Sequence, residues 1–470
     1  MSLRLYDTGT RSVRDFQPRL EGRVGIYLCG LTVQGPPHIG HLRSGVSYDV
    51  LINWLRHLGY DVTYVRNITD IDDKILTRET EQGRHWWAIA YENERALNRD
   101  YAALGVRAPT YEPRATGHMT EMISLISELL EKGHAYVTWN GDVYFSVASW
   151  NEYGALSHRR PEDVQSSPDT GDKQDPRDFA LWKGYKEGEP ADACWNSPWG
   201  YGRPGWHIEC SAMSRRYLGD GFDIHGGGVD IMFPHHENEM AQSHAAGLPF
   251  TAFWVHNGML NLSGSKMSKS VGNTLSVTAL AEKGFRPVDI RYYLVSAHYR
   301  SPLEYHDESL KEAAAAYDRI ANYVRRAAEA LGEDKTDPEQ ATTPILCADF
   351  VNAMDDDLNT PMALAAVHDQ IREGNAALDA KNLEAAESVA VGVRFMLKLL
   401  GLDPLDPHWN EPADAKGSGA LDALVSIALQ QRSDARKRKD FAAADAIRDQ
   451  LSEAGILVKD TPQGPTWTTQ

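Results

Sequence analysis

The stretch VGIYLCGLTVQGPPHIGHLRSGVSYDVLINWLRHLGYDVTYVRN, residues 24–67, decides the fold class. Its first six residues form a short apolar run, which favours a buried parallel strand. Apolar residues at helical spacing over 41–58 predict a helix that ends at Gly59. Residues 61–67 have the pattern of a second strand. A strand, a helix and a strand in this order predict a βαβ unit, so we expect an α/β, Rossmann-like nucleotide-binding domain.

The rest of the chain predicts an insertion in this domain, then an α-helical bundle and a small C-terminal mixed α/β module. Residues 157–190 are polar and predict a loop-rich insertion. Thr360, followed by Pro361, predicts a helix N-cap. The expected boundaries are 1–125 and 200–270 for the Rossmann-like catalytic domain, 126–199 for the inserted connective region, 271–308 for the region that follows the second motif described below, 309–402 for the bundle, and 420–470 for the C-terminal module.

Composition narrows the class of protein. With 48 Lys and Arg against 66 Asp and Glu, the formal net charge of −18 argues against nonspecific binding of nucleic acid, and we expect no DNA partner. Residues 1–15 lack the apolar core of a signal peptide, and no apolar run is long enough to cross a membrane, so we expect a cytoplasmic protein without membrane association. The 4 cysteines include no closely spaced pair, so no disulfide framework is indicated.

Two motifs have the chemistry of ATP binding. His38-Ile39-Gly40-His41 stands between the first strand and its helix, where unpaired N–H groups and a positive dipole end attract phosphate. Gly40 allows close approach, and the two imidazoles can stabilise charge at a phosphate. About 225 residues later, Lys266-Met267-Ser268-Lys269-Ser270 carries two ammonium groups in a Gly/Ser-rich loop that can close over a triphosphate. HIGH followed by KMSKS is the paired signature of class I aminoacyl-tRNA synthetases.

A set of soft and borderline ligands predicts a metal site. Cys29 ends the first strand, at the sheet edge where α/β proteins bind ligands, and Cys210 follows Trp206 in a turn or helix start. His235 and Glu239 are four residues apart and would share one face of a helix. Two thiolates, an imidazole and a carboxylate suit Zn²⁺. The residues alone leave the register open, because His236 and Glu237 adjoin this pair.

Five stretches together resemble the cysteinyl-tRNA synthetases of class I: Cys29-Gly30, NITDIDDK (67–74), GWHIECSAM (205–213), HGGGVD (225–230) and FPHHENE (233–239). The similarity covers essentially the whole chain. It implies one Zn²⁺ per chain, held by Cys29, Cys210, His235 and Glu239. A thiolate-rich zinc site would bind cysteine through its thiol and reject serine, so we expect no hydrolytic editing domain.

The resemblance also implies a reaction and its residues. Cysteine and ATP, accompanied by Mg²⁺, would give cysteinyl-adenylate, and the ribose hydroxyl at the 3′ end of tRNA(Cys) would then take the cysteine. The implied catalytic residues are His38, His41, Lys266 and Lys269. The implied ATP-binding residues are His38, Gly40, His41, Gly227, Gly228, Asp230, Lys266, Ser268 and Lys269. The implied substrate-cysteine residues are Cys29, Gly30, Thr69, Trp206 and Asp230.

The C-terminal third separates this function from its rivals. ATP-dependent ligases of mycothiol synthesis share the HIGH-like, zinc and KMSKS elements, but they join cysteine to an amino-sugar and lack a terminal tRNA-reading module. Here residues 432–440 are locally basic, and the stretch up to residue 467 resembles the anticodon-contacting end of the synthetases. The implied regions are a stem-contact region at 271–308, a tRNA-binding bundle at 309–402 and an anticodon-recognition module at 420–470. The expected tRNA contacts are Arg436, Arg438, Asp445, Asp460 and Trp467.

A third hypothesis is an RNA-binding paralogue without catalytic activity, against which the intact motifs argue. The family implies a monomer.

Overall fold

The structure is a computed structural model that describes residues 2–159, 172–262, 275–341, 345–410, 415–461 and 464–469. The chain divides into two compact units, Met1–Pro404 and Leu405–Gln470. The KMSKS residues, including Lys266, Ser268 and Lys269, lie outside the described residues. In the part of the chain that the structure describes, no helix is both long and apolar enough to cross a bilayer.

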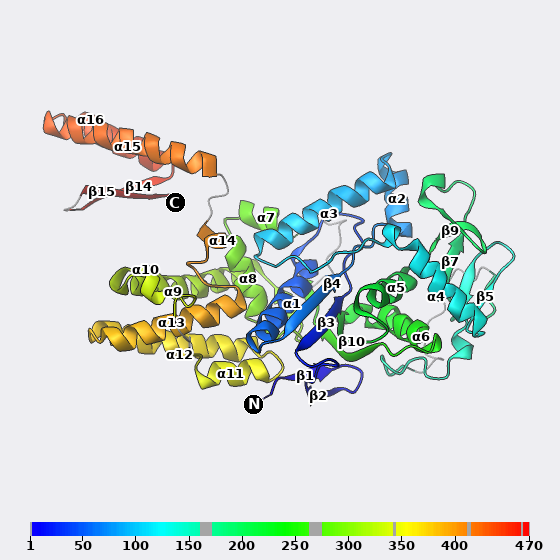
Figure 1. The fold of residues 1–470 in the computed structure, drawn as a ribbon. Coiled ribbons are helices and arrows are strands. Elements are labelled where there is room, and N and C mark those ends of the chain that lie inside the picture. Colours follow the sequence, from blue (N-terminus) through cyan, green and yellow to red (C-terminus); the bar gives the residue numbers. More distant parts are fainter. Residues whose placement is uncertain are drawn as a thin grey trace. The chain divides into compact units, whose positions relative to one another are not determined.

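A parallel sheet forms the core of the first unit (Figure 1). Its strands follow the order β11-β10-β3-β4, and each neighbouring pair is parallel. The bounds are β3 Arg23–Leu28, β4 Asp61–Arg66, β10 Phe222–Gly228 and β11 Thr251–Asn257. Helix α1, Ile39–His57, connects β3 to β4. This βαβ unit confirms the predicted α/β class.

The same part of the chain forms the helices α2 Asp73–Gln82, α3 Trp86–Ala103, α4 Met119–Glu131, α5 Trp206–Leu218 and α6 Glu237–Ala245. Short 3₁₀ and π turns are η1 Ala115–Gly117, η2 Val147–Ser149, η4 Ala191–Ala193, η5 Val229–Ile231 and η6 Met232–His236. Helix α5 packs on β3 and β4 and also against α6. This packing places residues of α5 and α6 near the end of β3, which Cys29 directly follows.

The insertion contains a second sheet. Its five antiparallel strands follow the order β5-β6-β7-β9-β8 and lie beside α4 and α5 (Figure 1). The bounds are β5 Ala135–Val137, β6 Val143–Phe145, β7 Phe179–Gly184, β8 Trp195–Ser197 and β9 Gly200–Pro204. The expectation of loop at 157–190 is wrong for β7, where Phe179, Leu181 and Trp182 are buried. The polar residues around this short apolar run concealed it.

Helices dominate the end of the first unit, as expected. They are α7 Val277–Glu282, α8 Pro287–Val295, α9 Asp307–Leu331, α10 Glu333–Thr336, α11 Ala348–Asp355, α12 Thr360–Asp379 and α13 Leu383–Leu400. Two small pairs of strands complete the unit: antiparallel β1 Arg4–Asp7 with β2 Ser12–Asp15, and parallel β12 Leu260–Leu262 with β13 Leu303–Tyr305.

A buried guanidinium joins the helical region to the sheet domain. Arg291 of α8 donates to the Asp49 carboxylate of α1 at 2.5 Å, to Leu400 O at 3.0 Å and to Leu104 O at 2.9 Å. Its side chain is fully buried. Because a buried charge is tolerated only when it is paired and hydrogen-bonded, these partners fix α8 and the end of α13 against α1.

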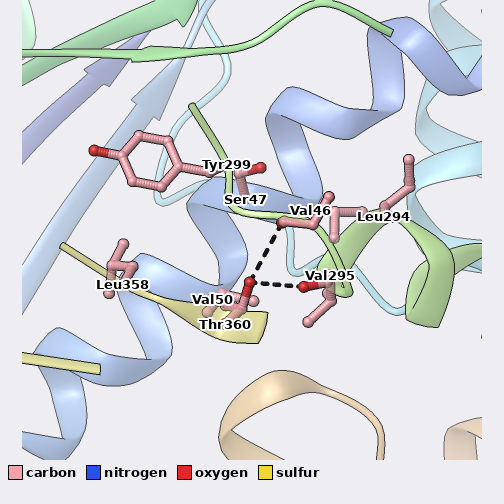
Figure 2. A pocket seen from close by; sticks show the side chains of 9 residues that line it. Val46, Ser47, Val50, Leu294, Val295, Tyr299, Leu358 and Thr360 are labelled. Carbon is pink, nitrogen blue, oxygen red and sulfur yellow. Dashed lines mark hydrogen bonds between the residues drawn. The ribbon is translucent and has the colours of Figure 1, made fainter. Parts of the chain in front are cut away.

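The N-cap of α12 differs from the prediction by one residue. The cap is Asn359, whose side chain accepts a hydrogen bond from Met362 N at 3.3 Å. The Thr360 hydroxyl instead donates to Val295 O at 2.6 Å, across a small cavity (Figure 2). This mainly apolar cavity, which is also lined by Val46 and Val50, holds no more than about one water molecule. It is too small to bind a substrate.

The second unit consists of α14 Pro407–Asn410, α15 Ala415–Lys437, α16 Phe441–Glu453, β14 Ile456–Thr461 and β15 Gly464–Thr469. The two strands form an antiparallel hairpin. The small hydrophobic core of the second unit contains Val425, Leu429, Leu451 and Ile456. This is the mixed α/β arrangement expected for the C-terminal end.

Candidate functional site

The site begins where β3 ends. Cys29 N donates to Gly226 O of β10 at 2.9 Å, and Gly30 N donates to the Asn67 side chain at 2.9 Å. A Cβ atom at residue 30 would lie 1.6 Å from Asn67 O, which no side chain could tolerate. Gly30 therefore lets the β3 and β4 ends approach each other directly beside Cys29.

The four predicted metal ligands converge next to this point. Ligand atoms of Cys29, Cys210, His235 and Glu239 all lie within 4.8 Å of one another. Cys210 comes from α5, His235 from η6 and Glu239 from α6. His235 and Glu239 meet at the spacing of four that was expected, although His235 lies in a π turn that runs directly into α6.

The spacing of these atoms fits a tetrahedral ion. The two sulfur atoms are 3.6 Å apart, Cys29 Sγ is 3.4 Å from Glu239 Oε1, and His235 Nε2 is 3.0 Å from the same oxygen. Zinc bonds of about 2.0–2.3 Å in a tetrahedron would separate such ligands by about 3.3–3.8 Å. Only small adjustments of the side chains would be needed to hold Zn²⁺.

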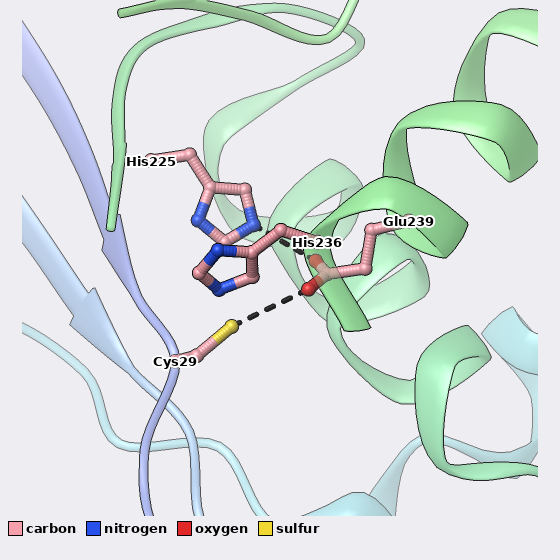
Figure 3. Close-up of side chains that lie close together, drawn as sticks. All are labelled: Cys29, His225, His236 and Glu239. Carbon is pink, nitrogen blue, oxygen red and sulfur yellow. Dashed lines mark hydrogen bonds and ion pairs between the residues drawn. The ribbon is translucent and has the colours of Figure 1, made fainter. Parts of the chain in front are cut away.

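A second group of potential ligands overlaps the first: Cys29 and Glu239 also meet His225 and His236 (Figure 3). This group offers a single thiolate, so it suits Zn²⁺ less well than the predicted set. His225 Nε2 instead lies 2.8 Å from Glu239 Oε2, the carboxylate oxygen that the first group leaves over. His236 Nδ1 lies 2.7 Å from His256 Nε2.

The environment of the cluster opposes charge in the absence of a cation. Burial raises the pKa of the Cys29 thiol well above its ordinary value, and burial also raises the pKa of Cys210. Burial lowers the pKa of His235 well below its ordinary value, so its imidazole is neutral. A divalent cation would reverse the preference of the thiols, because it stabilises their thiolates directly.

Two residues predicted to contact cysteine adjoin the cluster. The Trp206 ring stacks on His235 with centroids 4.2 Å apart. Thr69 is buried, and its hydroxyl donates to Glu209 Oε2 at 2.8 Å. Glu209 is a residue that the sequence analysis did not single out, although it stands within the GWHIECSAM stretch. Its pKa is raised well above the ordinary value by burial, while the hydrogen bond from Thr69 opposes this shift.

The HIGH histidines form the start of α1. His38 is the N-cap residue, and the rings of His38 and His41 stack with centroids 3.4 Å apart. The N–H groups were expected to be unpaired, but Ile39 N donates to Leu275 O at 2.9 Å and His41 N donates to His38 O at 2.8 Å. The expectation is wrong for these two groups, because a residue distant in sequence and the cap residue already satisfy them.

The glycines of β10 are tightly packed by protein atoms. A Cβ at Gly227 would approach Ile231 to 2.7 Å and His236 to 2.9 Å, and one at Gly228 would lie 2.3 Å from an Asp230 oxygen. Asp230 itself is exposed at the turn that follows β10. The glycine run therefore allows close packing around the metal cluster, and contact of Gly227, Gly228 and Asp230 with ATP remains a prediction.

The predicted tRNA contacts lie in the second unit. Arg436 and Arg438 are exposed near the end of α15, and Asp445 is exposed on α16, where its carboxylate lies 3.5 Å from Arg448. Trp467 of β15 is partly buried against the small core. Asp460 is in β14, but its side chain lies outside the described residues.

Comparisons with known proteins agree with this architecture. Residues 15–315 match the family model of the class I (C) tRNA synthetase catalytic domain, residues 349–404 match the DALR domain, and residues 418–467 match the cysteinyl-tRNA ligase anticodon binding domain. A cysteine–tRNA ligase from a Nocardioides species is 54% identical over 100% of both chains. Its counterpart from Streptomyces avermitilis is 52% identical and covers 100% of this chain and 99% of its own.

Solved structures show the same fold at low sequence identity. The Mycobacterium tuberculosis methionyl-tRNA synthetase in complex with methionyl-adenylate has a TM-score of 0.58 and 15% identity, covering 83% of this chain and 92% of its own. The LeuRS of Agrobacterium radiobacter K84, in a ternary complex with tRNA, has a TM-score of 0.59 and 12% identity, covering 84% of this chain and 85% of its own.

The fold and the catalytic-domain match define a class I aminoacyl-tRNA synthetase. Within that class, the chain belongs to the cysteinyl-tRNA synthetase family. Its activity is that of a cysteine–tRNA ligase, so the predicted family, fold class and enzyme class are confirmed. The match to an anticodon binding domain supports this activity over ligation to an amino-sugar. The roles of individual site residues and the domain boundaries stay predictions.

Proposed function

We propose that the chain activates L-cysteine with Mg²⁺-ATP and transfers it to the 3′ end of tRNA(Cys), with Zn²⁺ bound by Cys29, Cys210, His235 and Glu239. The observation that supports this most directly is the convergence of these four donors within 4.8 Å. When bound, Zn²⁺ would take the thiolate of cysteine as a further ligand beside the four protein donors, a position that the oxygen of serine would fill poorly.

The protein's own residues would position and stabilise the reacting groups. His38 and His41 at the start of α1 would donate to the α-phosphate as its charge grows, and Lys266 and Lys269 would neutralise the leaving pyrophosphate. Trp206 would cover the substrate side chain, because its ring stacks on His235. In this reaction, positioning and charge stabilisation provide most of the rate enhancement.

The proposal also covers tRNA recognition, cellular location and oligomeric state. The second unit would read the anticodon through the exposed Arg436 and Arg438, which are cationic in a chain with a net charge of −18. The enzyme would act in the cytoplasm as a monomer, without DNA or a membrane as partner. The acidic composition supports selectivity for RNA docked at a local basic region.

Two assays test the proposal in sequence. Zinc-replete protein should catalyse ATP–pyrophosphate exchange that depends on L-cysteine and does not respond to L-serine. Absence of exchange would instead support the RNA-binding paralogue without catalytic activity. Total tRNA and the amino-sugar acceptor of mycothiol synthesis are then supplied in parallel, and only tRNA(Cys) should be charged. Transfer to the amino-sugar alone would contradict the proposal.

A further inference from the structure

Glu209 is a buried carboxylate at the edge of the metal cluster, and no role has been assigned to it above. Its exposed fraction is 1%. Glu209 forms no ion pair with any residue that the structure describes.

The helix directs Glu209 toward the site. Trp206 precedes Glu209 by three positions and Cys210 by four on α5, so it neighbours both side chains on the helix surface. Trp206 stacks on the ligand His235, and Cys210 is itself a predicted ligand. Glu209 is therefore flanked on its own helix by two residues of the cysteine site.

A chain of side-chain contacts connects Glu209 to the cluster. Cys210 Sγ lies 3.6 Å from Asn67 Oδ1, Asn67 Nδ2 donates to Thr69 Oγ1 at 3.3 Å, and Thr69 Oγ1 donates to Glu209 Oε2 at 2.8 Å. This chain fixes the carboxylate without supplying a cation. A buried carboxylate in this state is costly unless a positive group arrives to pair with it.

The substrate carries such a group. In free cysteine, the ammonium nitrogen lies about 3–4 Å from the sulfur, depending on the rotamer. A thiol held at the cluster would thus bring its ammonium group close to the residues that surround the cluster, including the Thr69–Glu209 pair. We propose that the Glu209 carboxylate, oriented by Thr69, binds the α-ammonium group of cysteine. This inference rests on the proposed function, the binding of cysteine through its thiol at this cluster.

Calorimetry with the zinc-loaded enzyme tests it. The ligands are L-cysteine, cysteamine, which has the thiol and ammonium but no carboxylate, and 3-mercaptopropionate, which has the thiol and carboxylate but no ammonium. Glu209→Gln should raise the Kd of the first two ligands by about 30-fold or more, the loss expected for one partner of a buried charge pair. The Kd for 3-mercaptopropionate and the zinc content should be nearly unchanged.

Two variants serve as controls. Glu209→Asp keeps the charge and should restore part of the affinity for cysteamine. Asp70→Asn alters a neighbouring buried carboxylate whose oxygens already accept from Thr116 N at 2.9 Å and Thr116 Oγ1 at 2.5 Å. It should not discriminate between thiols with and without an ammonium group. An equal loss of affinity for all three thiols in Glu209→Gln would overturn the inference.

A measurement on the unaltered enzyme keeps the test independent of variant folding. Cysteamine should bind about 30-fold or more tightly than 2-mercaptoethanol, which has a hydroxyl in place of the ammonium group. Equal affinities would contradict the role of Glu209. If the zinc-loaded enzyme bound none of the thiols, the proposed function itself would fail, and that outcome is distinct from a loss of ammonium preference.

Discussion

The metal cluster and the C-terminal unit represent two opposite ways to build a functional region. The cluster is buried, and its residues come from the end of β3, which Cys29 directly follows, and from α5, η6 and α6, which converge from distant parts of the sequence. The C-terminal unit is local in sequence, has a small core and presents Arg436, Arg438 and Asp445 to solvent. Chemistry that discriminates between sulfur and oxygen needs fixed, desolvated ligands, whereas an RNA contact needs accessible charge.

The largest effect is expected from Cys210→Ser. Replacement of a thiolate by a hydroxyl should abolish stable zinc binding and lower cysteine-dependent ATP–pyrophosphate exchange by about 1,000-fold or more, because the metal loses one of its two soft ligands. Zinc content by atomic absorption and the exchange rate check this. Retention of both would remove Cys210 from the ligand set. Cys347→Ser, which alters a half-buried cysteine of the helical region, is the matched control.

Truncation of a core side chain in the C-terminal unit should impair tRNA aminoacylation without impairing cysteine activation. Leu451→Ala should destabilise this unit by about 2–3 kcal/mol, because Leu451 belongs to a core that contains few large side chains. Aminoacylation of tRNA should then weaken strongly, while ATP–pyrophosphate exchange stays near the unaltered rate. Thermal unfolding and both assays are the measurements. A parallel loss of exchange would show that the two regions do not function independently.

His225→Gln should have an intermediate effect. His225 Nε2 lies 2.8 Å from Glu239 Oε2, the carboxylate oxygen that does not face the other predicted zinc ligands. Loss of such an outer hydrogen bond typically lowers metal affinity by about 10–100-fold. Competition with a zinc chelator measures this. If metal affinity were lost completely, as in Cys210→Ser, His225 would instead be a ligand, as the overlapping group allows.

The smallest effect is expected from Arg438→Ala. An exposed arginine that contacts a phosphate should contribute about one counterion to the salt dependence of binding, so the slope against salt should decrease by about 1 and affinity should fall several-fold. Filter binding of tRNA(Cys) at several salt concentrations checks this. Exchange of ATP and pyrophosphate should be unaffected. Arg11→Ala, which alters an exposed arginine of the β1–β2 turn, is the control.

Local sequence patterns predicted well those helices and strands whose formation depends mainly on residues close in sequence. The strand before Cys29 and the helix that follows it have apolar spacing that a single element imposes on its own sequence. The predicted ligand set came from the family motifs, and the structure brings its four side chains together. Strand β7 was missed because its apolar run is short and polar segments surround it.

Tertiary partners limited the remaining predictions. Thr360 has the composition of an N-cap, but its hydroxyl is used by Val295 O, so Asn359 caps the helix. The N–H of Ile39 was expected to be available for phosphate, yet Leu275 O accepts it. Neither partner is near in sequence. The link between Thr69 and Glu209 was hidden for the same reason, since 140 positions separate the two residues.

Gly30 sets a boundary for anyone who would redesign this pocket for another thiol or for a selenol. A Cβ at residue 30 would lie 1.6 Å from the carbonyl oxygen of Asn67. In a mutant library that varies residue 30, substitutions of the glycine should therefore prevent the ends of β3 and β4 from packing together. The half-buried Trp206, whose ring stacks on the predicted ligand His235, offers a more tolerant position. Selection for new substrates should therefore enrich changes on α5 and retain glycine at the end of β3.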